Sequence, residues 1–168
     1  SMEAMRQLEE EKKTGIAEAR FLITAENPSS EARTMTVRSA LPKEIAAEDV
    51  LDQQGFILLY DQQQKTNVLE KEDQFAAKET KKYIITIRDI WRIPGEELVF
   101  HKEQTQKLQE FFKGSSFEKY AEEQGGAILD ILSGISKLQT ELDASLSLED
   151  RMRAFVLNTQ QMNVAKAK

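Results

Sequence analysis

The stretch that decides the fold is Lys81-Lys-Tyr-Ile-Ile-Thr-Ile-Arg-Asp-Ile90, together with the segment that follows it, Trp91-Arg-Ile-Pro-Gly95. The first ten residues place Tyr83, Ile85 and Ile87 on one side of an extended chain, as in a strand with one buried face. Pro94 then stands where a helix can begin, and the two glutamates after Gly95 put negative charge at the helix start. A strand-rich part thus gives way to a helical part, a segregation typical of α+β proteins.

Upstream of this stretch, short alternating runs predict further strands separated by turns. The run from Ile16 to Leu41 indicates two antiparallel strands joined at Asn27-Pro28-Ser29-Ser30, where Asn and Ser bond back to their own backbone. Residues 42–52 are predicted as a loop or a single helical turn. Five short strands with no long helix between them favour a small antiparallel, Ig-like β-sandwich. The other three strands are predicted over Phe56–Tyr60, over Thr66–Leu69 with a weak continuation at Gln74-Phe75, and over Lys81–Ile90.

Downstream of the stretch, apolar side chains recur at helical spacing from Leu98 to Gly114 and again beyond it. Ser115 or Ser116 can cap a second helix. Gly125-Gly126 weaken that helix by roughly 1 kcal/mol each relative to alanine, so a break near Gly125 is open. Ser147, followed three residues later by an acid, indicates the cap of a third helix. This part is predicted to form a helical hairpin or bundle of three helices.

The N-terminus predicts one more element. Residues 2–13 are strong helix formers, and Thr14-Gly15 would end a short helix there. Ser1-Met2 is predicted to be the remnant of a cleaved purification tag followed by a start methionine. The expected organisation is therefore a tag remnant and N-terminal helix at 1–15, an antiparallel β-sandwich at 16–92 and a helical region at 93–168.

The composition of the 168 residues removes several classes of function. With no cysteine and one histidine, the chain has no thiolate metal site, no thiol nucleophile and no histidine pair for zinc or iron. A net charge of −6 without a basic cluster argues against nucleic acid as the main ligand. The longest apolar stretches fall short of the roughly 18 residues that a membrane helix needs. No catalytic residue, metal ligand or cofactor is predicted.

Two groups of polar residues keep a catalytic or metal-binding role open. His101, with Glu97 four residues before it, is the one candidate acid or base near neutral pH, but no nucleophile motif accompanies it. Four loop carboxylates are oxygen ligands of the kind that calcium takes, although they lack calcium-loop spacing. We expect them to be solvated loop charges or helix caps. They are Glu48, Asp49, Asp52 and Asp61.

Two further features have both a structural and a binding interpretation. A buried Trp91 would close the bottom of the sandwich, whereas an exposed one would indicate a carbohydrate platform or an interface hot spot. The densest basic group is expected on a solvated strand face, with lipid or nucleic acid as the alternative. That group consists of Lys78, Lys81, Lys82, Arg88 and Arg92.

The most informative downstream feature is an apolar stripe along the predicted second and third helices. An amphipathic helix has to bury such a face, and two readings are open. Either the helices pack on each other as a hairpin that closes at 143–147, or part of the stripe meets a second copy or another protein. The junction between sandwich and helices is assigned to Trp91, Ile93 and Pro94. The stripe consists of Ile128, Ile131, Leu132, Ile135, Leu138, Leu142, Met152, Phe155 and Met162.

Five segments form a pattern along the first part of the chain: Asn27-Pro28, Leu41-Pro42-Lys43-Glu44-Ile45, Asp49-Val50-Leu51-Asp52, Phe56–Asp61 and Ile87–Pro94. Together they resemble a β-sandwich module of bacterial cell-envelope proteins that is followed by a long helical, coiled-coil-like tail. Arg151–Asn158 is similar to the arginine-rich, asparagine-containing final helix of such tails, so the resemblance covers about residues 16–165. It implies a structural or interaction module in the periplasm or on the cell surface, with no catalytic residues. A cytoplasmic location is left open.

The predicted function is a non-catalytic structural and interaction module, in which the sandwich orients amphipathic helices for association with a second copy or a protein partner. The alternative is a ligand-binding sandwich that takes carbohydrate or calcium in the loops Asp49–Gly55 and Asp61–Lys65. No nucleic acid and no small-molecule substrate is expected. Membrane contact is expected only through segments beyond this sequence.

Overall fold

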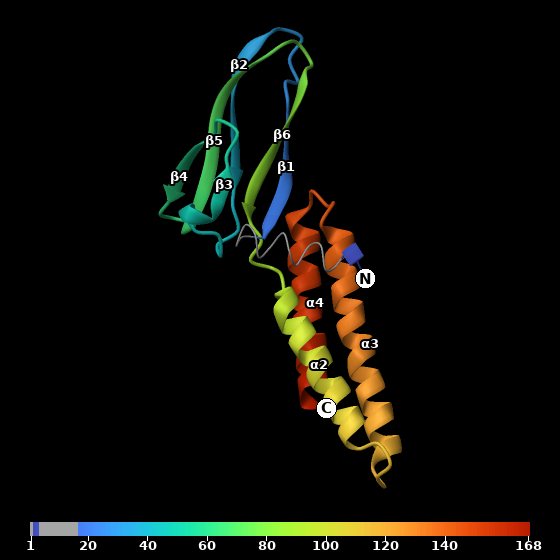
Figure 1. Ribbon diagram of the computed structural model, residues 1–168. Coiled ribbons are helices and arrows are strands. Elements are labelled where there is room, and N and C mark those ends of the chain that lie inside the picture. Colours follow the sequence, from blue (N-terminus) through green and yellow to red (C-terminus); the bar gives the residue numbers. More distant parts are fainter. Residues whose placement is uncertain (1, 4–16) are drawn as a thin grey trace. The chain divides into compact units, whose positions relative to one another are not determined.

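The computed structural model describes residues 2–3 and 17–168, so the predicted N-terminal helix lies outside the described residues except for Met2 and Glu3. The described residues form two small antiparallel sheets of three strands and three α-helices, which confirms the α+β class. They divide into two compact units (Figure 1). We call them the strand unit, Ala17–Asp89 with Leu146–Leu148, and the helical unit, Ile90–Ser145 with Glu149–Lys168.

The strand unit contains two sheets whose central strands are consecutive in the chain. In the first sheet the order is β1-β6-β3, and in the second it is β2-β5-β4. β1 and β2 therefore do not pair with each other, although they follow one another in the sequence. β1 pairs with β6 so that Phe21 lies opposite Ile85, and β2 pairs with β5 so that Val37 lies opposite Lys71. The strands are β1 (Glu18–Glu26), β2 (Arg33–Ala40), β3 (Val50–Asp52), β4 (Ile57–Asp61), β5 (Thr66–Phe75) and β6 (Thr80–Arg88).

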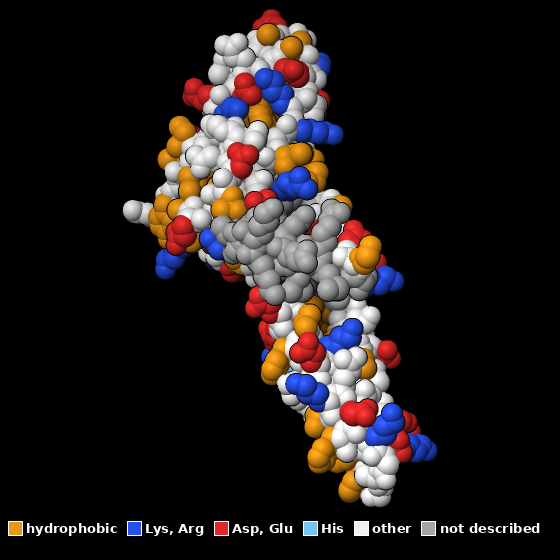
Figure 2. Space-filling view, viewed as in Figure 1, with side chains coloured by type: hydrophobic (Ala, Val, Ile, Leu, Met, Phe, Trp, Pro, Cys, Tyr) orange, Lys and Arg blue, Asp and Glu red, His pale blue; other side chains and the backbone are white. Residues whose placement is uncertain are grey.

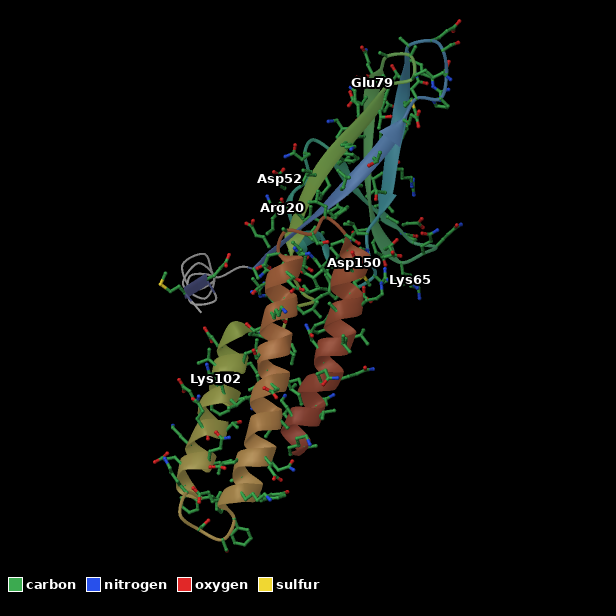
Figure 3. All side chains as sticks on the ribbon, turned by 90° about the vertical axis from the view of Figure 1, so that its right-hand side faces the viewer. Arg20, Asp52, Lys65, Glu79, Lys102 and Asp150 are labelled. Carbon is green, nitrogen blue, oxygen red and sulfur yellow. The ribbon has the colours of Figure 1, made fainter. Side chains whose placement is uncertain are left out.

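Two strands differ from the sequence prediction. The segment 42–52 contains the expected helical turn, a 3-10 helix at Ala47–Asp49, but Val50–Asp52 then pairs with β6. Three residues are too few for an alternating pattern, so the prediction missed β3. β5 runs unbroken through its charged centre, from Thr66 to Phe75, rather than as a weak interrupted strand. Lys65 and Glu79 lie in the turns at the two ends of β5 (Figure 3).

The charged centre of β5 remains extended because its side chains have partners on neighbouring strands. Glu70 pairs with Arg38 of β2 at 3.2 Å. Asp73 accepts a hydrogen bond of 2.7 Å from the Tyr83 hydroxyl of β6 and lies 3.3 Å from the Lys81 ammonium. The Lys71 ammonium lies 5.2 Å from the centre of the Tyr83 ring. The contacts of Asp73 and Lys71 join the central strands of the two sheets, and all of these contacts favour a strand that charge alone would interrupt.

Burial of Tyr83 and the hydrogen bond between Tyr83 and Asp73 shift the pKa values of these two residues. Burial, followed by the hydrogen bond to Asp73 and the negative charge of that residue, raises the pKa of Tyr83 from 10.0 to about 12. The hydrogen bond from Tyr83 lowers the pKa of Asp73 below 3.8, and the bond from Lys81 adds to this effect. Both shifts favour the pair in which the phenol is neutral and the carboxylate is charged.

This pair predicts a stability change in alkali. Because the folded pKa of Tyr83 exceeds its unfolded value, its contribution to stability is fully present below pH 10.0 and is lost as the pH rises towards 12. We expect the free energy of unfolding of the wild-type chain to exceed that of Tyr83→Phe by an amount that shrinks over this range. Urea unfolding of both chains at a series of pH values tests this. A difference that stays constant across the range would contradict it.

The helical unit contains α2 (Gly95–Phe111), α3 (Glu118–Leu142) and, from its second residue onward, α4 (Leu148–Ala167). The loop between α3 and α4 lies at the predicted 143–147. α3 is continuous through Gly125-Gly126, so the break that the glycines left open does not occur. A Cβ atom at Gly125 would lie 2.3 Å from the Gln109 side-chain nitrogen of α2. The glycine therefore permits a close approach of α2 and α3. α3 also begins at Glu118, later than the predicted serine caps.

Candidate interaction surface

The predicted apolar stripe lies largely inside the helical unit. Leu132, Ile135 and Met162 are buried in one cluster with Ile93 and Leu98, so α2, α3 and α4 all contribute to it. Three further stripe residues are partly buried against this cluster, and the remaining three are half-buried. These contacts support the packing of the helices on each other for most of the stripe. The two groups are Ile128, Ile131 and Phe155, and Leu138, Leu142 and Met152.

The junction residues are anchored within the helical unit. Trp91 and Ile93 are buried, whereas Pro94 is exposed at the start of α2. A buried Trp91 does not present a carbohydrate platform. The buried Gln139 side chain of α3 bonds to both backbone groups of Ile93. Its Oε1 accepts a hydrogen bond of 2.9 Å from the Ile93 N–H, and its Nε2 donates one of 3.1 Å to the Ile93 carbonyl. The chain that enters α2 is thereby fixed to α3 near its C-terminal end.

The two end residues of the Arg151–Asn158 motif, which carries part of the sequence resemblance, face inward. Arg151 and Asn158 are both buried on α4. Arg151 donates a bond of 3.4 Å to the carbonyl of Asp143, and the Asp143 carboxylate pairs with Arg92 at 2.8 Å. The motif therefore contributes to the α3–α4 hairpin.

The polar residues considered for catalysis or calcium binding have local structural partners. His101 lies 3.9 Å from Glu97, and the same Glu97 oxygen lies 3.1 Å from Lys166 of α4. Asp49 pairs with Arg88 at 3.2 Å. Among residues 2–3 and 17–168, no three His, Cys, Asp or Glu side chains gather as a metal site would require.

Asp52 and Asp61, which were also considered for calcium, and part of the basic group have structural contacts as well, and Glu48 lies in the 3-10 helix Ala47–Asp49. Asp52 accepts a hydrogen bond from the Gln54 N–H, and Asp61 accepts one from the Gln63 N–H. Such bonds are typical of turns. In the basic group, Lys81 and Arg88 face acids, and Lys78 donates to the carbonyl of Pro28.

The clearest exposed feature is the turn between α2 and α3. Gly114 has a φ of +79°, which favours glycine, and reverses the chain after α2. The Ser115 hydroxyl donates to the Phe112 carbonyl at 2.6 Å and accepts from the Phe117 N–H at 3.2 Å. The turn is therefore held by its own hydrogen bonds.

This turn gathers aromatic rings. The Phe112 ring stands edge-on to Phe111 and to Phe117, with centroids 5.1 Å and 6.0 Å apart. Such edge-to-face pairs are favourable beyond the area that they bury. We call this set the aromatic tip. It comprises Leu108, Phe111, Phe112, Phe117 and Tyr120.

The aromatic tip leaves much of its apolar surface in water. Leu108 is 57% exposed, Phe111 77%, Phe117 59% and Tyr120 64%. With 150–250 Å² for a whole aromatic side chain, these fractions correspond to roughly 500 Å² of apolar surface, towards the upper end of the range for the largest patch on a monomer. Hydrophobic side chains gather over α2 and towards this turn in the lower part of Figure 2. The largest apolar patch on a monomer is often functional, so the aromatic tip is a candidate interaction surface.

The charges around the aromatic tip are mixed. Lys113 pairs with Glu110 at 3.9 Å and Lys119 with Glu123 at 3.9 Å, and all four side chains are highly exposed. Exposed pairs of this kind contribute little to stability, so they can exchange partners at low cost. The flanking residues give no excess of positive charge for phosphates or anionic lipids. They are Lys107, Lys113, Lys119, Glu110, Glu118, Glu122 and Glu123.

Comparisons with family models, with curated proteins and with solved structures found no match to this chain. Across the part of the chain that the structure describes, no helix combines the length and the hydropathy needed to cross a membrane.

The sequence reasoning placed the aromatic residues on helices but assigned the interaction surface elsewhere. Phe111 and Phe112 end the helical run that the sequence predicts from Leu98 to Gly114, and Phe117 and Tyr120 follow the predicted serine caps of the next helix. The signal for the tip was present in the sequence, because two apolar faces meet at one glycine turn, where both helices end.

Proposed function

We propose that this chain is a non-catalytic structural and interaction module of the bacterial cell envelope, in the periplasm or on the cell surface. Its helical unit carries the interaction surface, and the single observation that supports this role is the exposed aromatic tip. The envelope location rests on the resemblance of its sequence motifs. The proposal includes no catalytic residue, cofactor or small-molecule substrate.

The strand unit is, in this proposal, an Ig-like β-sandwich that orients the helices. Side-chain contacts between the two sheets support it, since Tyr83 and Lys81 of β6 reach Asp73 of β5. Burial supports it as well, because side chains from both sheets are almost fully withdrawn from water. These are Phe21, Ile23, Ile85 and Ile87 from one sheet and Val37, Leu69 and Phe75 from the other.

The partner that best fits the aromatic tip is a second copy of the chain. A twofold contact places each apolar ring set against the same set, and the surrounding lysines and glutamates of one copy can face those of the other. The uncovered area of roughly 500 Å² per copy is less than the 800 Å² of a standard stable interface. The tip alone therefore gives a weak, concentration-dependent association.

Cysteine cross-linking tests the tip contact directly, because the chain has no cysteine of its own. In Ser116→Cys, the exposed turn between α2 and α3 carries the only thiol. We expect mild oxidation to yield a covalent dimer whose amount rises with concentration, because a tip-to-tip contact brings two thiols together. Adding Phe111→Glu should suppress the dimer by several-fold, since charges would then replace the most exposed rings.

The matched control is Ser133→Cys, an equally simple change at an exposed position in the middle of α3. It should cross-link only at the level of random collision. Equal yields at the two positions, or a yield at Ser116→Cys that Phe111→Glu does not change, would refute the tip contact.

A further inference from the structure

The turn between α3 and α4 lacks the signals that usually end a helix. Its residues, Asp143-Ala-Ser-Leu-Ser147, include no glycine and no proline, whereas helices commonly end at a glycine and are often followed by a proline. Asp143 itself has α-helical dihedral angles, with a φ of −59° and a ψ of −31°. Glu141 and Asp143 stand at the negative end of α3, where the helix dipole favours bases. Apart from the cap that Ser147 offers to α4, the local sequence favours a continued helix.

Contacts with other parts of the chain hold this turn. The carbonyl of Leu146 accepts a hydrogen bond of 3.2 Å from the Leu22 N–H of β1. The Asp143 carboxylate pairs with Arg92 at 2.8 Å, and the Asp143 carbonyl accepts a bond of 3.4 Å from Arg151. In a continuous helix that carbonyl would instead accept the N–H four residues later. We call these three contacts the turn latch.

α4 leaves three large apolar side chains in water and fully buries one. The fully buried one is Met162, and Met152 and Phe155 are half-buried. The other fully buried residues are small or polar, so α4 is held to the bundle by little apolar contact. These are Arg151, Ala154, Asn158 and Ala165. The side chains in water are Val156 at 57% exposed, Leu157 at 48% and Val164 at 47%.

The three exposed side chains of α4 lie on the continuation of the apolar face of α3. A helix turns by about 100° per residue, so in a helix that continued through 143–147 all three would lie within about 60° of Ile135. Leu146, which is 39% exposed in the turn, would lie on the same face. Glu149 and Arg153, which fall there as well, pair with each other at 3.5 Å. The residues that α4 buries in the hairpin would lie about 100–180° away from Ile135.

We propose that α3 and α4 are a latched hairpin, which opens into one continuous helix over residues 118–167 when the turn latch is released. The open helix is about 75 Å long at 1.5 Å per residue. The closed form uses one face of α4 and the open form the other, so the same segment has two arrangements of helix and apolar face. This device goes beyond the proposed function and does not depend on the aromatic tip, which lies at the turn between α2 and α3.

The distance between two spin labels tests the opening, because the chain has no cysteine of its own. Ser133→Cys and Gln161→Cys place the labels at exposed positions of α3 and α4, away from the shared apolar face. In the hairpin the two helices run side by side (Figures 1 and 3), and the axes of packed helices are about 8–10 Å apart. In the continuous helix the labelled residues would be about 40 Å apart. Dilution with unlabelled chain restricts the measurement to distances within one molecule.

The turn latch is weakened by a loop variant that combines Asp143→Ala, Ser145→Ala and Ser147→Ala. It removes the ion pair with Arg92 and the serine cap of α4, and it leaves only strong helix formers in the turn. We expect the labelled wild-type chain to show the short distance, and the loop variant to show a second population near 40 Å. Helix content measured by circular dichroism should stay the same or rise. A milder variant with the two serine changes alone should show a smaller population at the long distance.

The matched control is Glu149→Pro, at an exposed position in the first turn of α4. Proline is tolerated in the first turn of a helix but breaks a helix interior. Added to the loop variant, Glu149→Pro should therefore restore the short distance, whereas Glu149→Ala should not. Loop variants that show only the short distance would overturn the proposal. A long distance that Glu149→Pro leaves in place, or that comes with a loss of helix content, would also overturn it, because α4 would then melt rather than join α3.

Discussion

Replacing Gln139 with alanine should lower the free energy of unfolding of the helical unit by roughly 3 kcal/mol, because each buried polar group left without a partner costs about 1–3 kcal/mol. The Gln139 side chain satisfies both the N–H and the carbonyl of Ile93, at 2.9 Å and 3.1 Å, and it is itself buried. Urea unfolding followed by Trp91 fluorescence measures the effect, since Trp91 is the only tryptophan and lies in this unit.

The matched control is Gln160→Ala, which makes the same chemical change at an exposed position of α4. It should change the free energy of unfolding by less than about 0.5 kcal/mol, as surface substitutions usually do. Gln139→Glu adds a second comparison, because an ionised carboxylate accepts from the Ile93 N–H but cannot donate to the Ile93 carbonyl. If the two alanine variants have the same free energy of unfolding, the hydrogen bonds from Gln139 to Ile93 do not stabilise the unit.

Replacing Asn27 with alanine should destabilise the strand unit by a similar amount, roughly 3 kcal/mol, since several buried groups lose their partners at once. Asn27 is fully buried where β1 ends. Its Nδ2 donates to the carbonyls of Glu31 and Ala76, at 2.9 Å and 3.0 Å. Its Oδ1 accepts from the Ser29 N–H at 3.0 Å. One side chain thus holds the turn after β1 to the turn after β5.

Thermal unfolding followed by circular dichroism in the strand region measures this effect, with Trp91 fluorescence as the reference for the helical unit. Ser30→Ala is the control, because Ser30 is exposed in the same turn. Asn27→Asp should lose nearly as much stability as Asn27→Ala, since the carboxylate retains the acceptor but cannot donate to the two carbonyls. A melting temperature of Asn27→Ala that matches that of Ser30→Ala would show that Asn27 contributes no more than an ordinary turn residue.

The sequence allowed the class and most elements to be predicted, because those depend on local periodicity. The alternation of Tyr83, Ile85 and Ile87 identified β6, and the loop at 143–147 was predicted from the gap between two apolar faces. Pairing could not be predicted in the same way. Alternation indicates which face of a strand is buried, but it does not say which strand lies beside it. The separation of β1 and β2 into different sheets was therefore missed.

The surroundings of each apolar face could not be predicted, for a related reason. Amphipathic spacing shows that a face avoids water, yet it does not say whether the partner is another helix of the same chain. Leu132 and Ile135 pack against residues of α2 and α4, whereas Phe111 and Phe117 lie at a turn and are 77% and 59% exposed. Only the three-dimensional arrangement separates these two outcomes.

The burial of Gln139 could also be predicted, but its hydrogen-bond partner could not. It lies four residues after Ile135 and three before Leu142, so it occupies a position on the apolar stripe itself. A glutamine at such a position is expected to have a buried hydrogen-bond partner. The identity of that partner, the backbone of Ile93, depends on a contact between residues 46 positions apart and was beyond a reading of local patterns.

The pairing of β1 with β6 has a consequence for the newly made chain on the ribosome. Arg20 of β1 is synthesised 66 residues before its neighbour Thr86, and Leu22 bonds to Leu146, which is made later still. Until β6 emerges, the apolar face of β1 has no strand beside it and is open to chaperones or to misassociation. A nascent chain halted after β5 should therefore be captured by a chaperone and digested rapidly by protease. A chain halted only once β6 has left the exit tunnel should begin to resist the protease.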